Sequence, residues 1–111
     1  MRIGDLDRQI RFERLDDATN PDFGGSTQQW VPVATVWAQV QDALPSRAET
    51  VQQNMEITSR PARIRIRWRP GLTSAMRIVV LGQYPRTMQI VSGPAELGRR
   101  QWLEFMAEEV V

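Results

Sequence analysis

The chain places an arginine at every second position between residues 63 and 69. In the stretch SRPARIRIRWRP, residues 59–70, the alternating residues are Arg63, Arg65, Arg67 and Arg69 on one side and Ala62, Ile64, Ile66 and Trp68 on the other. A strand sends successive side chains to opposite faces, so this period predicts one apolar face and one guanidinium face. Guanidinium groups bind carboxylates and phosphates through planar, forked hydrogen bonds. The chemistry that this pattern offers is the binding of anions.

Three interpretations of this arginine face are open from the residues alone. A solvated face is the ordinary expectation for a run of charge. Pairing with carboxylates of a neighbouring strand or another subunit is the second, for instance with Glu13 or with the C-terminal glutamates Glu104, Glu108 and Glu109. Contact with phosphates is the third, as in a barrel that follows single-stranded nucleic acid beside Trp37 and Trp68. Because Trp68 falls on the apolar side of the strand, a combined stacking and phosphate surface is disfavoured.

The composition removes most enzymatic chemistry. The chain has no cysteine or histidine, and all 14 of its basic residues are arginine. Disulfides, thiolate or imidazole metal sites, and nucleophiles built on Cys, His or Lys are therefore excluded. The acidic residues show no spacing that certifies a catalytic pair. We expect a protein that is not an enzyme and that binds no cofactor or metal.

Length and charge indicate one soluble domain. A chain of 111 residues, 41% of them hydrophobic, can bury a real core, and we expect a single domain over residues 1–111. No apolar run approaches the length of a membrane span, and the acidic start does not resemble a signal peptide. The formal net charge is +1, so no global field draws the protein onto nucleic acid.

Short segments of alternating character, separated by Gly and Pro, predict an all-β fold. The expected strands cover residues 9–14, 30–41, 59–70, 76–81, 87–92 and 101–106. The side chains expected to face inward on three of them are Ile10 and Phe12, Met88 and Ile90, and Leu103 and Phe105. No helix of crossover length lies between strands, which excludes a parallel α/β sheet. The prediction is a small antiparallel β-barrel of about six strands, with long loops and at most one short helix.

The segment 30–41 differs from the others because both of its faces are partly apolar. One face carries Val36, Ala38 and Val40, and the other carries Val33 and Trp37. We therefore expect this strand to be covered on both sides. Trp37 is expected in the core or between subunits, rather than as a base-stacking platform.

Several segments have loop composition. Residues 15–29 are polar and contain Asn-Pro and Gly-Gly pairs, so we expect a flexible loop; its acids Asp16 and Asp17 fit no known calcium-loop spacing and are expected to be solvated. Residues 42–58 hold a capping-box pattern, with a short helix over 47–54 and a mobile loop as the two alternatives. Residues 93–100 are expected to be a loop, and residues 107–111 an acidic tail.

The order of these segments resembles a known family. The most specific pieces are GDLDRQI near the N-terminus, VWAQV, and IRIRW followed by a Pro-Gly turn and MRIVVLG. Together with the long Gly-containing segment before VWAQV and a closing TMQIV, they span nearly the whole chain. This arrangement resembles the tailed-bacteriophage head–tail joining proteins, also called head-completion, head-closure or stopper proteins.

The resemblance implies a structural protein of the virion neck, assembled in the host cytoplasm. Members are small β-barrels that form a ring, expected to be a dodecamer, below the portal and adaptor and above the tail terminator or tail proteins. The ring closes the DNA-filled head and provides the tail attachment platform, and genomic double-stranded DNA passes through its channel without sequence-specific binding. The isolated protein is expected to be a monomer or weak oligomer. The alternative is an OB-like barrel that binds single-stranded nucleic acid through Arg63–Arg69.

The resemblance also assigns expected contact residues. In stopper members, the connection between the second and third long strands projects into the channel. The matching segment here is 42–58, whose candidate channel-lining residues are Arg47, Glu49, Gln52 and Gln53. The candidates for contacts between subunits or with partners are Arg63, Arg65, Arg67, Arg69, Asp16, Asp17, Phe23, Glu108 and Glu109.

Overall fold

Six antiparallel strands close into a barrel. A computed structural model describes residues 2–20, 25–43 and 59–110. A 3-10 turn, η1 (Ile3–Asp5), precedes the strands β1 (Arg8–Asn20), β2 (Gly25–Asp42), β3 (Ser59–Arg67), β4 (Arg77–Val80), β5 (Arg86–Leu97) and β6 (Trp102–Val110). Within the described ranges, no helix has the length and apolarity that a membrane crossing requires.

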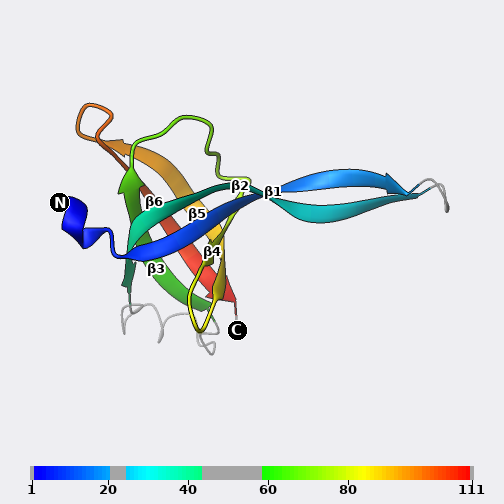
Figure 1. Cartoon of the computed structure of the whole chain (residues 1–111), viewed down its shortest axis with the longest axis horizontal. Coiled ribbons are helices and arrows are strands. Elements are labelled where there is room, and N and C mark those ends of the chain that lie inside the picture. The colour runs from blue at the N-terminus through cyan, green and yellow to red at the C-terminus, as the bar shows by residue number, and fades with distance from the viewer. Residues whose placement is uncertain (1, 21–24, 44–58, 111) are drawn as a thin grey trace, which may run out of the picture.

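The strand order explains how the barrel closes (Figure 1). The order is β1-β2-β3-β6-β5-β4, and β4 pairs back onto β1. Every neighbouring pair is antiparallel, so the predicted all-β antiparallel barrel is confirmed. Among the described residues, closure removes most free strand edges from the wall, but residues 90–97 of β5 pair with β6 alone. Contacts with other proteins can therefore use side-chain surfaces, this short edge of β5, or elements that leave the wall.

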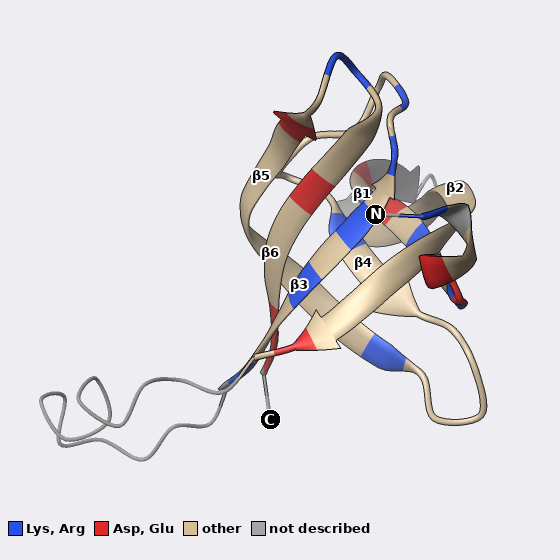
Figure 2. Ribbon diagram, turned by 90° about the vertical axis from the view of Figure 1, so that its left-hand side faces the viewer, with Lys and Arg blue, Asp and Glu red and all other residues tan. Residues whose placement is uncertain are grey.

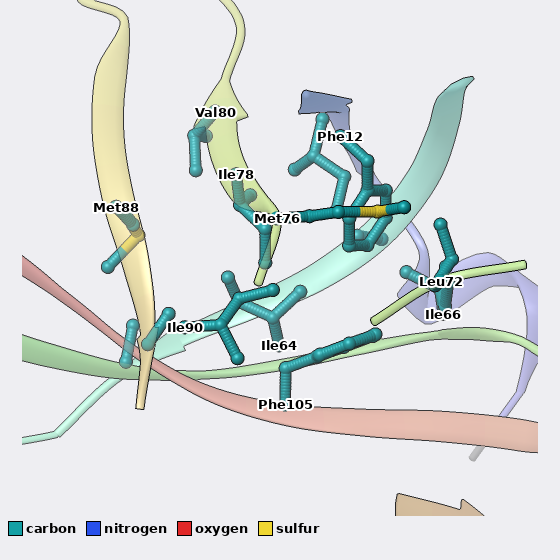
Figure 3. Packing of buried hydrophobic residues seen from close by; sticks show 14 of the residues in the cluster. Phe12, Ile64, Ile66, Leu72, Met76, Ile78, Val80, Met88, Ile90 and Phe105 are labelled. Carbon is teal, nitrogen blue, oxygen red and sulfur yellow. The ribbon is translucent and has the colours of Figure 1, made fainter. Parts of the chain in front are cut away.

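The core is built from the alternate, inward-facing residues of all six strands (Figure 3). Ile10, Phe12, Ile64, Met88 and Phe105 are completely buried, and Ile66, Ile90 and Leu103 are nearly so. The rings of Phe12 and Phe105 meet across the barrel interior with centroids 5.3 Å apart and planes inclined at 51°. The strand period of two therefore placed the core residues correctly, because each strand has only one face on the interior.

The first two strands continue far beyond the barrel. Residues 14–20 of β1 pair with 25–31 of β2 and with no third strand among the described residues, whereas Ile10 to Glu13 also pair with β4. We call this two-stranded extension the arm; Figure 1 shows it projecting to the right of the barrel. The radius of gyration is 16.2 Å, against about 13 Å for a compact domain of this length.

The arm corrects one prediction. The segment 15–29 was expected to be a flexible loop, but its described residues, 15–20 and 25–29, are paired strand; residues 21–24 lie outside the described ranges. The alternation of apolar and polar residues reveals a strand only when one face is buried. A ribbon with water on both faces has no such alternation, so its polar composition resembled that of a loop.

Two boundaries near the C-terminus also differ from the predictions. The expected loop 93–100 is strand up to Leu97, where β5 pairs with β6 through a ladder with register shifts near Ser92. Gly93 and Pro94 lie inside this irregular part, so they mark a bulged strand rather than a loop. The expected acidic tail is strand up to Val110, with Ala107 almost completely buried.

The expectation that β2 is covered on both faces is wrong for the described chain. Ala38 on the inner face is fully buried, but Trp37 and Val33 on the outer face are 56% and 39% exposed. Trp37 is therefore not a core residue. The other part of that expectation, a position between subunits, stays a prediction. The expected helix over 47–54 lies outside the described residues.

Candidate functional site

Two of the four arginines of this face pair with one glutamate of the neighbouring strand. Arg65 lies directly opposite Glu104 in the β3–β6 ladder, and its Nε donates a hydrogen bond to Oε1 of Glu104 over 2.9 Å. The Nε of Arg63 lies 3.8 Å from the same oxygen, so one carboxylate faces two guanidinium groups. Figure 2 shows basic positions along β3 beside an acidic position on β6. Of the three interpretations, pairing with a carboxylate of a neighbouring strand holds for these two arginines, and the partner is Glu104, one of the C-terminal glutamates.

The other two arginines have no acidic partner within the described residues. Arg67 is exposed at the end of β3, and Arg69 follows the strand and is half-buried. The Nε of Arg69 is buried without a hydrogen-bond partner in the described part of the chain. A buried guanidinium nitrogen without an acceptor is costly, so this end of β3 can still accept an anionic group.

These two arginines border an apolar groove. The groove has a volume of about 330 Å³ and is lined by Leu6, Val36, Trp37, Arg67, Trp68 and Arg69. We call it the Trp37–Trp68 groove. Its side chains come from the segment before β1, from β2 and from the end of β3, which lie together because β2 pairs with both strands. The groove combines two indole rings with two guanidinium groups, which suits an apolar side chain next to a carboxylate.

Trp68 is fixed by neighbours on the β5–β6 side. Its Nε1 donates a hydrogen bond to Oε1 of Glu96 over 3.2 Å, and the guanidinium carbon of Arg100 lies 5.2 Å from its ring centroid. Trp68 also packs against the core cluster, as its place on the apolar side of the strand predicted. One wall of the groove is therefore held in place before any partner binds.

A second cluster lies where the arm leaves the barrel. Glu13 is 5% exposed and accepts hydrogen bonds from the Nε atoms of Arg11, at 2.8 Å, and Arg77, at 2.7 Å. The guanidinium of Arg77 also stacks over the ring of Trp30, 4.4 Å from its centroid. A groove of about 470 Å³ lies beside this cluster and is lined in part by Trp30, Met88 and Arg77.

Sequence reasoning named Glu13 only as a candidate partner of the arginine face and missed its burial. The burial depends on Arg77, which lies opposite Glu13 in the β1–β4 ladder and 64 residues away in sequence. No local pattern signals such a pair. The suggestion that Glu13 is a partner of the arginine face is wrong, because its partners are Arg11 and Arg77.

A third cluster lies at the end of the barrel where β2 and β6 end and β5 begins. Arg86, at the start of β5, donates hydrogen bonds to Glu109 on β6 at 2.8 Å and to Asp42 at the end of β2 at 2.9 Å. Burial of Arg86 alone would lower the pKa of its guanidinium, but the carboxylates of Glu109 and Asp42 raise the pKa above its ordinary value. The predicted contact residue Glu109 thus has a partner within its own chain, and Glu108 lines the larger groove.

The remaining predicted contact residues lie in the arm or outside the described ranges. The carboxylate of Asp16 lies 3.5 Å from Nη1 of Arg14, and the backbone of Asp17 pairs with Gln28 of β2. Phe23 and the candidate channel-lining residues Arg47, Glu49, Gln52 and Gln53 lie outside the described residues. Those predicted residues that the structure describes are therefore not gathered into one site; they are distributed over the barrel wall, both of its ends and the arm.

Known proteins match this chain at the level of family and fold. The solution structure of protein SF1141 from Shigella flexneri 2a superimposes with a TM-score of 0.69 at 27% identity, covering 98% of this chain and 96% of that one. A chain in the virion of a native gene transfer agent particle gives a TM-score of 0.65 at 24% identity, covering 95% of this chain and 94% of that one, and shows a shared fold. No curated protein matches significantly.

The family assignment comes from a match over almost the whole sequence. The model of the family described as "Phage head completion protein" matches residues 1–110. This match confirms the resemblance that the order of GDLDRQI, VWAQV, IRIRW and MRIVVLG indicated. The closed barrel and its arm are thus the architecture of a phage structural protein of the head–tail region, found in the virion. The chain belongs to the phage head completion protein family.

Proposed function

We propose that this protein assembles as a ring in the virion neck, with the portal and its adaptor on one side and the tail terminator or tail proteins on the other. In that position it closes the DNA-filled head and forms the platform to which the tail attaches. Its role is structural rather than enzymatic. Membership of the phage head completion family supports the location, and the absence of Cys, His and Lys from the sequence fits a protein without catalytic chemistry.

The observation that carries the proposal is the arm. A two-stranded ribbon is at best marginally stable in water by itself, so an exposed ribbon of this length is expected to gain stability from a neighbour. The seven residue pairs from Arg14–Val31 to Asn20–Gly25 extend it by about 23 Å. Most of the described barrel wall is paired on both sides, so the arm and the two grooves are the features best suited to contact with a neighbour.

The ring would enclose the DNA path. The resemblance suggests that residues 42–58, including Arg47, Glu49, Gln52 and Gln53, face the channel, and this stays a prediction from sequence. We also expect a dodecamer in the virion and a monomer or weak oligomer in isolation. Double-stranded DNA would pass without sequence-specific contacts, because a formal net charge of +1 gives no general attraction to phosphate.

One observation fits the alternative of a single-strand-binding barrel: Trp37 and Trp68 line one groove with Arg67 and Arg69, although the alternation in sequence had placed Trp68 away from the arginines. Such a barrel needs a continuous cationic groove with stacking rings. Here Arg63 and Arg65, in the middle of the face, share the carboxylate of Glu104, so the cationic surface is not continuous. Only Arg67 and Arg69, at one end of β3, lack an acidic partner in the described part of the chain.

Cryo-electron microscopy of the parent particle tests the proposed function. We expect a ring of this barrel between the portal–adaptor assembly and the tail. Particles made without the gene should be filled heads that lose DNA and carry no tail. Finding the protein absent from purified particles, or normal tailed particles without the gene, would overturn the proposal. Single-stranded DNA binding at low salt with a steep salt dependence would instead support the alternative function.

A further inference from the structure

We propose that the arm of one copy docks into the Trp37–Trp68 groove of the next copy, with arm carboxylates meeting Arg67 and Arg69. This inference rests on the proposed ring and names the contact that builds it. The occupant is a second copy of this chain, contributing an exposed β-ribbon that is apolar and acidic. The groove then becomes the acceptor and the arm the donor of one repeated interface.

The groove has the chemistry of an unfilled interface. Trp37 is 56% exposed, and large aromatic rings that are exposed at a protein surface are typical of contact sites. At the same end, Arg67 is exposed and Nε of Arg69 is buried without an acceptor in the described part of the chain. A carboxylate entering beside the indole rings would pair with the guanidinium groups of Arg67 and Arg69 while an apolar side chain covers Trp37.

The arm carries the complementary groups. Its described strands hold Asp16 and Asp17 against one arginine, Arg14, so they have an excess of negative charge. Leu15, next to Asp16, is 44% exposed. The exposed leucine and the half-exposed carboxylate of Asp16 provide the apolar and acidic groups that a groove with indole rings and two guanidinium groups accepts.

The position of the two parts makes the contact intermolecular. Leu6, in the groove, precedes β1, which runs away from the groove and ends in the arm; β2 returns from the arm and reaches the groove at Trp37. Donor and acceptor therefore lie at opposite ends of the same strand pair, and Figure 1 shows the arm pointing away from the N-terminal side of the barrel. A donor and an acceptor on opposite sides of a subunit produce a head-to-tail contact, which closes into a ring when the rotation allows.

Disulfide trapping tests this contact, because the natural chain has no cysteine. Gln28→Cys places a thiol on the exposed part of the arm, and Thr35→Cys places one on the outer face of β2, two residues before Trp37. Mixing the two single variants at high concentration should give the mixed disulfide dimer far more than either self-dimer. Tyr84→Cys, at the exposed turn between β4 and β5, is the control and should not cross-link to Gln28→Cys.

The variant with both cysteines extends the test to the particle. Assembled virions should yield a ladder of cross-linked multimers on denaturing gels. If particles contain the protein as a ring but show no such ladder, the docking inference fails while the proposed function stands. If the protein is absent from particles, the proposed function fails first.

Charge reversal gives an independent measurement. Asp16→Arg with Asp17→Arg reverses the arm, and Arg67→Glu with Arg69→Glu reverses the groove. Each double variant alone should lower trapping by about tenfold or more, because like charges then face each other. Mixing the two double variants should restore the yield of trapped dimer. In the mixture, the mutant arm of one variant can meet the mutant groove of the other, and the natural arm can meet the natural groove. Arg60→Glu, exposed at the other end of β3, is the control.

Rescue by mixing separates this contact from other occupants of the groove. If an acidic segment of a portal or tail protein fills it, Arg67→Glu with Arg69→Glu would block incorporation into particles and the reversed arm would not rescue it. If DNA phosphates fill it, the groove variant would weaken DNA retention and leave arm trapping unchanged. Either result would overturn the inference, as would failure of the mixture to restore trapping when circular dichroism shows both variants folded.

Discussion

The Nε of Arg77 donates a hydrogen bond to Oε1 of Glu13 over 2.7 Å and so joins β4 to β1 at the base of the arm. Glu13 accepts a second hydrogen bond from Arg11, and the guanidinium of Arg77 covers the ring of Trp30 on the other strand of the arm. One buried carboxylate and two arginines therefore fix the point at which the arm leaves the barrel. The direction of the arm depends on this cluster.

Replacing Glu13 with glutamine should destabilise the fold. Glutamine has nearly the same shape but no charge, so Arg11 and Arg77 would lose the carboxylate between them. Both arginines are about one-third exposed, so water screens part of the interaction and the loss should be smaller than for a fully buried ion pair. We expect the free energy of unfolding to fall by about 2 kcal/mol. Urea denaturation measures it. Asp7→Asn, at an exposed position, is the matched control, and equal stability of the two variants would contradict the prediction.

Gly93→Ala should disrupt the β5–β6 ladder. Gly93 has a φ of +111°, and a Cβ there would lie 2.7 Å from the carbonyl oxygen of Glu104. Backbone strain and this contact together should cost about 3 kcal/mol. Thermal unfolding measures the effect. Gly4→Ala adds a methyl group with nothing within 4 Å and serves as the control. A melting temperature for Gly93→Ala equal to that of Gly4→Ala would show that the strands adjust freely.

Arg86→Met should loosen the end of the barrel where Asp42 and Glu109 converge. The arginine side chain is 19% exposed, and its loss leaves two carboxylates without a donor, which we expect to cost about 1 to 2 kcal/mol. Because the folded pKa of Arg86 is raised, its stabilisation is complete below the pKa of the unfolded chain and is lost only as pH rises through the folded pKa. The stability difference should stay constant from about pH 7 to about pH 10, and a steady fall over that range would disprove it.

Arg65→Ala should impair folding or assembly rather than DNA retention. Arg65 and Glu104 are each about one-quarter exposed, and a double-mutant cycle between them should give a coupling of about 0.5 to 1 kcal/mol. Arg60→Ala, at an exposed position, should show little change. Particle yield and retained DNA should be measured together. Normal numbers of tailed particles that leak DNA would mean that Arg65 acts toward the channel.

Local patterns were sufficient for the barrel and its core. Alternation identified Ile10 and Phe12, Ile64 and Ile66, and Leu103 and Phe105 as inward-facing, and all six are buried. The order of short segments identified the family as well. Both depend on neighbours in sequence: a strand in a barrel has one wet and one dry face, and a segment order survives even when each piece is weak.

The arm could not be predicted from sequence, because its two strands pair only with each other and pack against no core among the described residues. A polar strand that pairs with only one neighbour has no dry face, so residues 15–29 resembled a loop. The strands around Gly93 and Ala107 were shortened for a related reason. Glycine, proline and glutamate are typical of loops, and only pairing with β6 or β3 shows that they belong to strands.

Local sequence patterns alone predicted an all-β barrel, the residues of its core, a strand of alternating arginines and a place in the phage head completion family. Only the folded chain shows which carboxylate each arginine meets: Glu104 for Arg63 and Arg65, and Glu13 for Arg77. It also left Arg67 and Arg69 at the groove without such a partner in the described residues. Strand pairing brings residues tens of positions apart into register, and no pattern within one strand specifies its neighbour.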